Sequence, residues 1–339
     1  MSEPNTTHTP QALGEFALIE RYFRRDAALP AGVALGIGDD CALLAPAPGM
    51  QIAVSSDMLV EGRHFLSTVA PDRLGHKALA VNLSDLAACG ARPLAFTLAL
   101  ALPRPDAAWL DGFARGLFAL ADAHGCALVG GDTTAGPLNL CITVFGEVPP
   151  RQTLERRGAR VGDEVWVSGT PGEARLALEV FRGTLSLPQA AFERARARME
   201  TPTPRVALGL ALRGIASACA DVSDGLAGDL GHILTASGVG ACIDAEDASL
   251  LLAQPDQLAL GYGEFSAEMR LECVLAGGDD YELVFTAPES AHDAVRRAAA
   301  AADTPVTRIG RIEATPGLRL RAHDGRVRPC PYGGFDHFG

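Results

Sequence analysis

Lysine is almost missing from this chain, since Lys77 is the only lysine among 29 basic residues in a sequence of 339. No GxxxxGKS/T motif surrounds it, so the chain has no P-loop that would hold phosphates on a lysine. A GxGxxG motif is also missing, which disfavours a Rossmann dinucleotide site, and so are the HRD and DFG motifs of protein kinases. If the protein binds a nucleotide, we expect carboxylates and metal ions to hold it.

Long hydrophobic runs and paired cysteines are missing as well. The most apolar stretch, residues 93–103, is too short to cross a bilayer. Residues 1–12 lack the apolar core of a signal peptide and are predicted to form a disordered tail. The eight cysteines include no CxxC pair, which disfavours a zinc site and predicts buried thiols in a reducing cytoplasm. The net charge of -12 argues against nucleic acid or an anionic membrane as a partner.

The length of the chain predicts two domains, and the pattern changes in a proline-rich and charged stretch near residue 150. We assign residues 13–149 to an N-terminal domain and residues 150–339 to a C-terminal α/β domain. Apolar periodicity predicts mixed α/β structure in both. In the N-terminal domain we expect helices at residues 14–25, 71–89 and 106–124, strands at residues 33–37, 51–55 and 93–102, and a strand that runs into a glycine-rich turn at residues 126–134.

Aspartates recur where apolar runs meet glycine, serine or threonine, as they do at strand ends and helix starts. These residues are Asp39, Asp40, Asp57, Asp85, Asp132, Asp221, Asp224, Asp279 and Asp280. Burying an unpaired carboxylate is costly and clustered carboxylates repel one another, so a shared site would require cations. Oxygen ligands of this kind suit Mg²⁺, and the sequence therefore predicts a site that uses Mg²⁺ to hold polyphosphate.

Each of these residues also has a purely structural interpretation. The adjacent acids Asp39 and Asp40 could form a turn, and Asp57 or Asp132 could cap a helix or a tight turn. Three candidates outside the acids carry the same ambiguity: His64 in a loop, Arg156 at the domain junction and Tyr332 near the C-terminus.

A series of motifs, taken in order, resembles bacterial thiamine-monophosphate kinases, which are relatives of aminoimidazole ribonucleotide synthetase. They are GDDCALL, SSDMLVEGRHF, HKALAVNLSDLAACGA, GGDTT, DVSDGL, GGDDYEL and a terminal GGFDHF, and the resemblance runs from Gly14 to the C-terminus. It implies that ATP converts thiamine phosphate to thiamine diphosphate, in the cytoplasm and with several Mg²⁺ ions. It also implies a homodimer whose N-terminal domains bind ATP and Mg²⁺ and join their sheets into a barrel, with the active site in the cleft between the domains.

The resemblance also assigns roles to residues. Mg²⁺ ions would be held by Asp40, Ser55, Ser56, Asp57, Asp85, Asp132, Asp221 and Asp224. ATP would contact Gly131, Asp132, Arg156 and Ser223, and thiamine phosphate would face His64, Asp279 and Tyr332. Asp57, Asp85 and Arg156 would support the transition state. The sequence departs from the family at three of these positions, with Asp279 where Glu is expected, Tyr332 where Trp is common and Ser56 where Thr is frequent.

The reaction so implied needs no protein nucleophile. A phosphate monoester has a second pKa near ~6, so its attacking oxygen is already anionic at neutral pH, and we expect direct in-line transfer without a general base. The obstacle is repulsion between two anions, which Mg²⁺ offsets. Two alternatives stay open: another ATP-using enzyme of the same superfamily, and a nucleotide- or metal-binding module without turnover. Release of ADP with thiamine phosphate would distinguish them.

Overall fold

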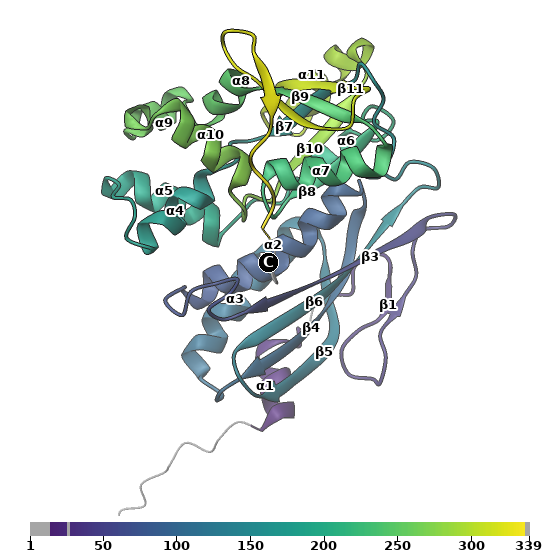
Figure 1. Ribbon diagram of the computed structural model, residues 1–339. Helices are drawn as coiled ribbons and strands as arrows, with labels where there is room; N and C mark the ends of the chain where they lie inside the picture. The colour runs from purple at the N-terminus through teal and green to yellow at the C-terminus, as the bar shows by residue number, and fades with distance from the viewer. Residues whose placement is uncertain (1–13, 26–27, 336–339) are drawn as a thin grey trace, which may run out of the picture.

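The computed structural model describes residues 14–25 and 28–335, which form two domains, each built on its own β-sheet (Figure 1). The mixed α/β fold expected from the sequence is confirmed. The predicted tail, residues 1–12, lies outside the described residues. The predicted boundary at residues 149–150 falls between the last strand of the first sheet, β6 (Asn139–Val148), and the first strand of the second sheet, β7 (Glu164–Ser168).

The N-terminal sheet has four strands in the order β3–β6–β4–β5, of which only β4 and β5 pair in parallel. The other strands are β3 (Gln51–Val60), β4 (Arg92–Leu102) and β5 (Ala127–Ala135). Helices α2 (Pro71–Ala88) and α3 (Ala107–His124) cover one face, where side chains such as Leu98 and Ile142 are buried. Ahead of this sheet lie α1 (Glu15–Tyr22) and a hairpin of β1 (Val33–Leu35) and β2 (Leu43–Leu44).

Helices α2 and α3 begin and end close to where the sequence predicts. Pro71 lies in the first turn of α2, where its missing N–H has no helical partner to lose. Asp106 caps α3 by accepting a hydrogen bond from the backbone N–H of Trp109 at 3.0 Å. The two helices pack closely because of Gly75, since a Cβ atom there would lie 2.1 Å from the carbonyl oxygen of Phe113.

Two strands are longer than predicted, which changes where two aspartates lie. Strand β3 pairs with β6 along its whole length, so the prediction that Asp57 lies at a strand end is wrong. Strand β5 runs through the GGDTT motif, so Asp132 lies within a strand where a turn was predicted. Gly131 permits this path, because its φ is 143° and a Cβ atom there would lie 1.8 Å from the carbonyl oxygen of Leu98. Pairing with β4 has overridden the turn preference of the glycines.

The C-terminal domain has a seven-stranded sheet in the order β13–β12–β9–β11–β7–β10–β8. Its further strands are β8 (Ala218–Val222), β9 (Gly240–Asp244), β10 (Glu282–Ala287), β11 (Val306–Glu313), β12 (Gly317–Arg321) and β13 (Val327–Pro329). Its helices are α4 (Glu173–Phe181), α5 (Gln189–Glu200), α6 (Val206–Ala211), α7 (Leu226–Ser237), α8 (Ala245–Ser249), α9 (Pro255–Ala259), α10 (Ala267–Ala276) and α11 (His292–Ala301), with 3-10 turns η1 (Leu250–Leu252), η2 (Tyr262–Glu264) and η3 (Glu289–Ala291). Every residue of β8 and β10 is buried, so these strands form the core of the domain.

Helix α2 joins the two domains. It packs on the N-terminal sheet and also contacts β8, β10 and α6. Figure 1 shows α2 below β8 and α7, with the C-terminal segment descending toward it. Because α2 is covered from both sides, its polar residues lie at the junction between the domains.

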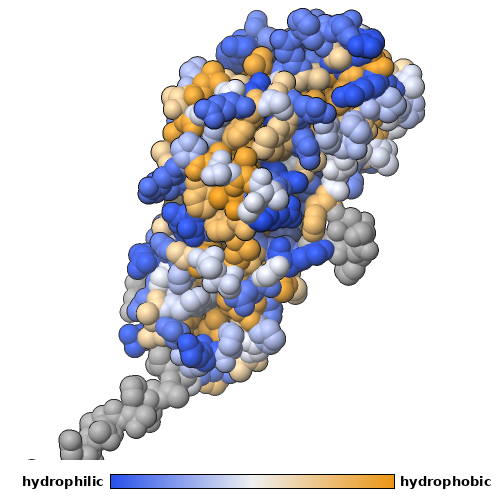
Figure 2. Space-filling view, turned by 60° about the vertical axis from the view of Figure 1, so that its left-hand side comes forward, coloured by the Kyte–Doolittle hydropathy of each residue, from blue (hydrophilic) through white to orange (hydrophobic). Residues whose placement is uncertain are grey.

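The surface of the described residues mixes hydrophilic and hydrophobic patches. On the face shown in Figure 2, hydrophilic residues cover the upper end and hydrophobic patches lie across the middle of the molecule. A further apolar group comes from β3, where Ile52, Val54, Met58 and Val60 lie on the open face of the N-terminal sheet and are 36% to 58% exposed. Among the helices within residues 14–25 and 28–335, none is long and apolar enough to cross a membrane.

Candidate active site

Three of the predicted aspartates converge at the junction between the domains. Asp57 comes from β3, Asp85 from α2 and Asp221 from the end of β8. The hydroxyl of Ser55 donates a hydrogen bond to Oδ2 of Asp85 at 2.5 Å, and the hydroxyl of Ser84 donates to Oδ2 of Asp221 at 2.9 Å. Because Ser84 and Asp85 are neighbours on α2, these contacts hold a strand of each domain against the same turn of one helix.

These three carboxylates affect one another's protonation. Burial raises the pKa of Asp57 to about 6, and repulsion from Asp85 adds to the shift. Burial also raises the pKa of Asp85, which the serine hydrogen bond and the charge of Arg156 offset only in part. The pKa of Asp221 is raised well above its ordinary value, first by burial and then by Asp85. We call Asp57, Asp85 and Asp221 the acidic cluster; cations of the protein compensate its charge only in part.

The turn after β8 brings a fourth carboxylate, Asp224, near this cluster. The backbone N–H groups of Ser223 and Asp224 both donate to Oδ2 of Asp229 at 3.1 Å. Asp229 is buried in the first turn of α7, and burial raises its pKa to about 7. Asp229 therefore fixes the turn, while the charge of Asp224 contributes to the raised pKa of Asp57.

A buried cation lies at the other end of the junction. Lys77 on α2 is 2% exposed, and its Nζ donates to Oδ1 of Asp279 at 2.9 Å and to the carbonyl oxygen of His64 at 3.2 Å. The hydroxyl of Tyr281 donates to the same oxygen of Asp279 at 3.2 Å. Burial raises the pKa of Tyr281, and the charges of Asp279 and Asp57 add to this shift. Two residues predicted to face the substrate, His64 and Asp279, thus lie beside Lys77, and Tyr281 next to them is close enough to Asp57 for its pKa to be affected by that charge.

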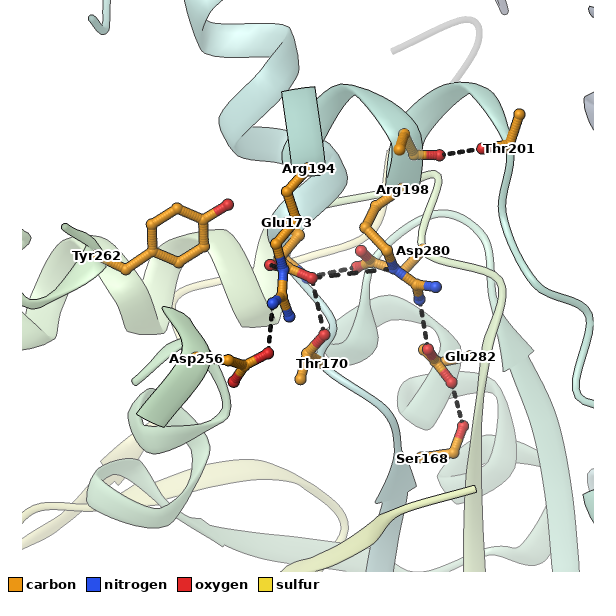
Figure 3. Close-up of polar contacts among 12 residues, drawn as sticks. Ser168, Thr170, Glu173, Arg194, Arg198, Thr201, Asp256, Tyr262, Asp280 and Glu282 are labelled. Carbon is orange, nitrogen blue, oxygen red and sulfur yellow. Dashed lines mark hydrogen bonds and ion pairs between the residues drawn. The ribbon is translucent and has the colours of Figure 1, made fainter. Parts of the chain in front are cut away.

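The adjacent aspartates of the GGDDYEL motif point in different directions. Whereas Asp279 faces Lys77, Asp280 is 1% exposed, and its Oδ2 accepts a hydrogen bond from the backbone N–H of Gly172 at 2.8 Å. Figure 3 shows Asp280 inside the C-terminal domain, beside Arg198 and the arginine–glutamate contacts of that region. Burial raises the pKa of Asp280 well above its ordinary value. Asp280 therefore belongs to the core of the domain and not to the junction.

Arg156 lies in the connection between the domains, beside an open cavity of about 510 Å³. Asp85, Asp221 and Arg156 line one part of the cavity. Much of the remaining wall is apolar and includes Ala53, Val54, Leu86, Leu154 and Ala220. A cavity that combines an apolar wall with a few charged groups is suited to a ligand with an apolar and an ionic part.

Among the residues predicted to bind metal or ATP, Asp40, Ser56, Gly131 and Asp132 do not belong to the acidic cluster. Asp40 lies in an exposed loop between β1 and β2, and the hydroxyl of Ser56 lies 2.9 Å from that of Thr143 on the open face of the sheet. Gly131 and Asp132 lie on β5, the edge strand opposite β3. Within the described part of the chain, none of the four forms a hydrogen bond or ion pair with the acidic cluster. Their assignment to metal and ATP stays a prediction.

Tyr332 lies in the C-terminal segment, partly buried against the core of the C-terminal domain. Further along this segment, the backbone N–H of Phe335 donates to the carbonyl oxygen of Asp224 at 2.9 Å. The guanidinium of Arg63, next to His64, lies 5.0 Å from the ring centre of Phe335. The segment therefore connects the loop after β3 to the turn that holds Asp224.

The sequence analysis did not identify several residues that complete this site. They are Lys77, Asn82, Ser84, Asp229 and Tyr281, and Asn82 accepts a hydrogen bond from the backbone N–H of Asp57 at 3.1 Å. Three of them lie on α2 among alanine, leucine and valine residues. Polar groups in so apolar a helix must find partners when they are buried, and this was the available signal.

The residues at the junction fit Mg²⁺ that is bound together with phosphate. The described residues contain no group of three or more His, Cys, Asp or Glu side chains that could hold a metal ion. Mg²⁺ is commonly bound through one or two carboxylates together with waters and substrate phosphates, and the acidic cluster supplies such carboxylates. Burial and mutual repulsion raise the pKa values of its members, so a nearby cation would stabilise their charged forms.

Comparison with known proteins defines the class of this fold. Family models for the N-terminal and C-terminal domains of AIR synthase related proteins match residues 38–148 and 160–323. The structure of HypE from Escherichia coli, a hydrogenase maturation protein, matches with a TM-score of 0.73 over 95% of this chain and 97% of that chain. At 20% identity this likeness shows the fold alone.

Relatives of higher identity narrow the class. The chain is 44% identical over 329 residues to the thiamine-monophosphate kinase of Salmonella typhimurium, and the aligned region covers 96% of this chain and 99% of that protein. The crystal structure of thiamine-monophosphate kinase from Stenotrophomonas maltophilia matches with a TM-score of 0.80 at 45% identity, over 94% of this chain and 99% of that one. A complex of AaThiL with AMPPCP and TMP matches with a TM-score of 0.74 at 29% identity, over 87% and 89% of the two chains. This chain therefore belongs to the thiamine-monophosphate kinase family.

Proposed function

We propose that this protein transfers a phosphoryl group from ATP to thiamine phosphate and so produces thiamine diphosphate. The observation that carries the proposal is the acidic cluster, whose partly compensated charge suits cations and polyphosphate. The names of the relatives support the acceptor, and the related complex with TMP also holds AMPPCP, an analogue of ATP. All eight cysteines are free, which fits the expected place in a reducing cytoplasm.

When bound, Mg²⁺ would offset the charge of the polyphosphate and align donor and acceptor. Its proposed ligands at the junction are Asp57, Asp85, Asp221 and Asp224, with the hydroxyl of Ser55 beside them. Asp40, Ser56 and Asp132 complete the proposed set on the basis of the family resemblance. Gly131, Asp132 and Ser223 are the proposed contacts of ATP.

The proposed transfer is direct. A non-bridging oxygen of thiamine phosphate forms a bond to the γ-phosphorus of ATP, and the bond from that phosphorus to the β–γ bridging oxygen breaks, so that ADP leaves with the electron pair. The attacking oxygen is anionic at neutral pH because the second pKa of a phosphate monoester is near ~6. Arg156, beside Asp85 at the edge of the cavity, would contact the transferring group and stabilise its charge. His64, Asp279 and Tyr332 would face thiamine phosphate.

A homodimer is the proposed assembly, formed through the N-terminal sheet. Strand β3 is an edge strand of ten residues. On its open face the residues Val54 and Met58 are 58% and 55% exposed to solvent. A long edge strand with exposed apolar side chains is normally covered, and a second copy of the same sheet would cover it. The double variant Val54→Glu, Met58→Glu should therefore be a monomer in light scattering, and a dimer of unchanged mass would contradict this assembly.

The test of the activity is the release of ADP from ATP with different acceptors. With Mg²⁺ and thiamine phosphate we expect equal amounts of ADP and thiamine diphosphate, and only background release with no acceptor. ADP release that depends on a different acceptor would favour another enzyme of the superfamily. Binding of ATP without any ADP release would favour a nucleotide-binding module.

A further inference from the structure

We propose that Lys77 is a positioning residue for the acceptor, because it holds Asp279 and the loop of residues 61–65 in the geometry that binds thiamine phosphate. This inference rests on the proposed function and deepens it. Lys77 is the only lysine of the chain, and the sequence offers no phosphate-binding loop around it. Its place in the structure gives it a different role.

The contacts of Lys77 connect three separate segments. A buried ammonium group is costly unless it is paired, and Nζ of Lys77 is paired with Oδ1 of Asp279 at 2.9 Å and with the carbonyl oxygen of His64 at 3.2 Å. Lys77 belongs to α2, His64 to the loop after β3, and Asp279 to the turn before β10. The contact therefore bridges the N-terminal and C-terminal domains at the end of the junction where both proposed acceptor residues lie.

The ring of His64 is fixed from a second direction. The backbone N–H of Val60 donates to Nδ1 of His64 at 3.0 Å, so the neutral imidazole carries its proton on Nε2. Lys77 holds the backbone of the same residue through the carbonyl oxygen. Together these contacts set both the position of His64 and the ring nitrogen that can donate a hydrogen bond.

Asp279 is held in an uncommon backbone conformation. Its φ is 65°, which non-glycine residues seldom adopt, and its backbone N–H donates to the carbonyl oxygen of Ser223 at 2.9 Å. Its side chain is 35% exposed and accepts hydrogen bonds from both Lys77 and Tyr281. The carboxylate is thus oriented by two donors while it keeps a face toward solvent, as a residue that binds a ligand requires.

A simpler alternative is that Lys77 only stabilises the contact between the domains. The chain offers a matched control for this alternative in Arg73, one turn earlier on α2. Arg73 also reaches across to the C-terminal domain, where its Nη1 lies 2.8 Å from Oε2 of the buried Glu200 on α5. Loss of either contact removes an ion pair between the domains, but only Lys77 contacts residues proposed to bind the acceptor.

The experiment compares Lys77→Met with Arg73→Met by steady-state kinetics and thermal unfolding. For Lys77→Met we expect the KM for thiamine phosphate to rise about tenfold or more, while the KM for ATP changes less than about twofold. For Arg73→Met we expect both KM values to stay within about twofold, even where Tm falls. Asp279→Asn should resemble Lys77→Met, and the double variant should show little additional increase, because the two residues act as a unit.

Two outcomes would overturn the inference: an unchanged KM for thiamine phosphate in Lys77→Met, or equal increases in both KM values. Should Lys77→Met fail to fold, Lys77→Arg provides the same comparison, because it keeps the charge but changes the donor geometry. We expect Lys77→Arg to raise the KM for thiamine phosphate by less than Lys77→Met does, again with little change for ATP. If the unmodified protein makes no ADP with thiamine phosphate, the proposed function itself fails, which is a separate result.

Discussion

The molecule contains two groups of buried or partly buried carboxylates with opposite electrostatics. In the C-terminal domain, Glu282 is fully buried and accepts a hydrogen bond from Arg198 at 2.5 Å (Figure 3). It also accepts a hydrogen bond from Arg205 at 2.6 Å. Burial would raise the pKa of Glu282, but the two arginines outweigh it and lower the pKa below its ordinary value. At the domain junction, burial raises the pKa of Asp57 and Asp85, and no comparable set of arginines opposes it.

Glu282 and Glu173 are fully buried, whereas Asp57 and Asp85 are only partly buried, so the raised pKa values of the two aspartates do not come from deeper burial. The difference lies in the cations that the protein itself supplies. Where arginines neutralise an acid, as they do for Glu282 and for Glu173 through Arg194, the charge is paired within the domain. The charge of the acidic cluster is compensated only in part, and its pKa values are perturbed, which is typical of a functional site. A cation bound together with a ligand would supply the positive charge that the protein itself does not provide there.

The comparison is tested most strongly by substituting one carboxylate in each group. At the junction, Asp85→Asn should lower kcat at least about a hundredfold, because a charge proposed to support the metal is lost at the proposed site of phosphoryl transfer. Thermal unfolding should show little loss of stability, since an incompletely compensated buried charge disappears. The exposed Asp111 on α3 provides the control Asp111→Asn, and near-normal turnover of Asp85→Asn would refute the assignment.

In the second group the expected effect is on stability. Removing one partner of a buried ion pair leaves the other charge unpaired and costs about 3–5 kcal/mol. Glu282→Gln should therefore lower the free energy of unfolding by an amount of this order, measured in urea, while the folded fraction keeps its KM for ATP. A stable variant with impaired ATP binding would show instead that the arginine network serves the active site.

A smaller effect is expected in the pH dependence of stability without metal. The folded protein binds a proton at Asp57 up to about pH 6, whereas the unfolded chain releases it near its ordinary value of 3.8. Between pH 3.8 and about 6, the folded state therefore holds more protons than the unfolded chain. The free energy of unfolding is unaffected by Asp57 below this range and falls as the pH rises through about 6, because the folded protein must then carry the charged carboxylate.

Asp57→Asn removes this penalty, so in EDTA its Tm should exceed that of the unmodified protein by a few degrees at pH 8 and by much less near pH 4. Glu282 has the opposite sign, because its lowered pKa makes its contribution largest at neutral pH and smaller in acid. A Tm difference for Asp57→Asn that stays constant with pH would contradict the raised pKa.

The sequence signals that single out the acidic cluster are local. Helix α2 follows from apolar periodicity and a proline in its first turn, and Asp57, Asp85 and Asp221 stand out as acids in apolar segments. The extents of β3 and β5 were missed, because they depend on pairing with strands far away in the sequence. The segment between residues 245 and 276 forms short helices that the sequence analysis did not predict, because so short a helix gives little apolar periodicity.

Local sequence signals also could not predict which residues pair with the buried charges. The two aspartates of the GGDDYEL motif are equivalent in sequence, yet one turns to Lys77 and the other to the backbone of Gly172. Lys77 and Asp279 are 202 residues apart, so only the packing of α2 between the domains brings them together. Tertiary contacts, and not residue type, decide which acid faces the junction.

The most direct test of the account is calorimetric titration of the protein with AMPPCP, with Mg²⁺ and with EDTA. If the acidic cluster holds the nucleotide through divalent cations, binding should require Mg²⁺ and should be lost in Asp57→Asn, while Asp111→Asn binds normally. Equally tight binding in EDTA, or normal binding by Asp57→Asn, would contradict the claim that cations join these carboxylates to polyphosphate.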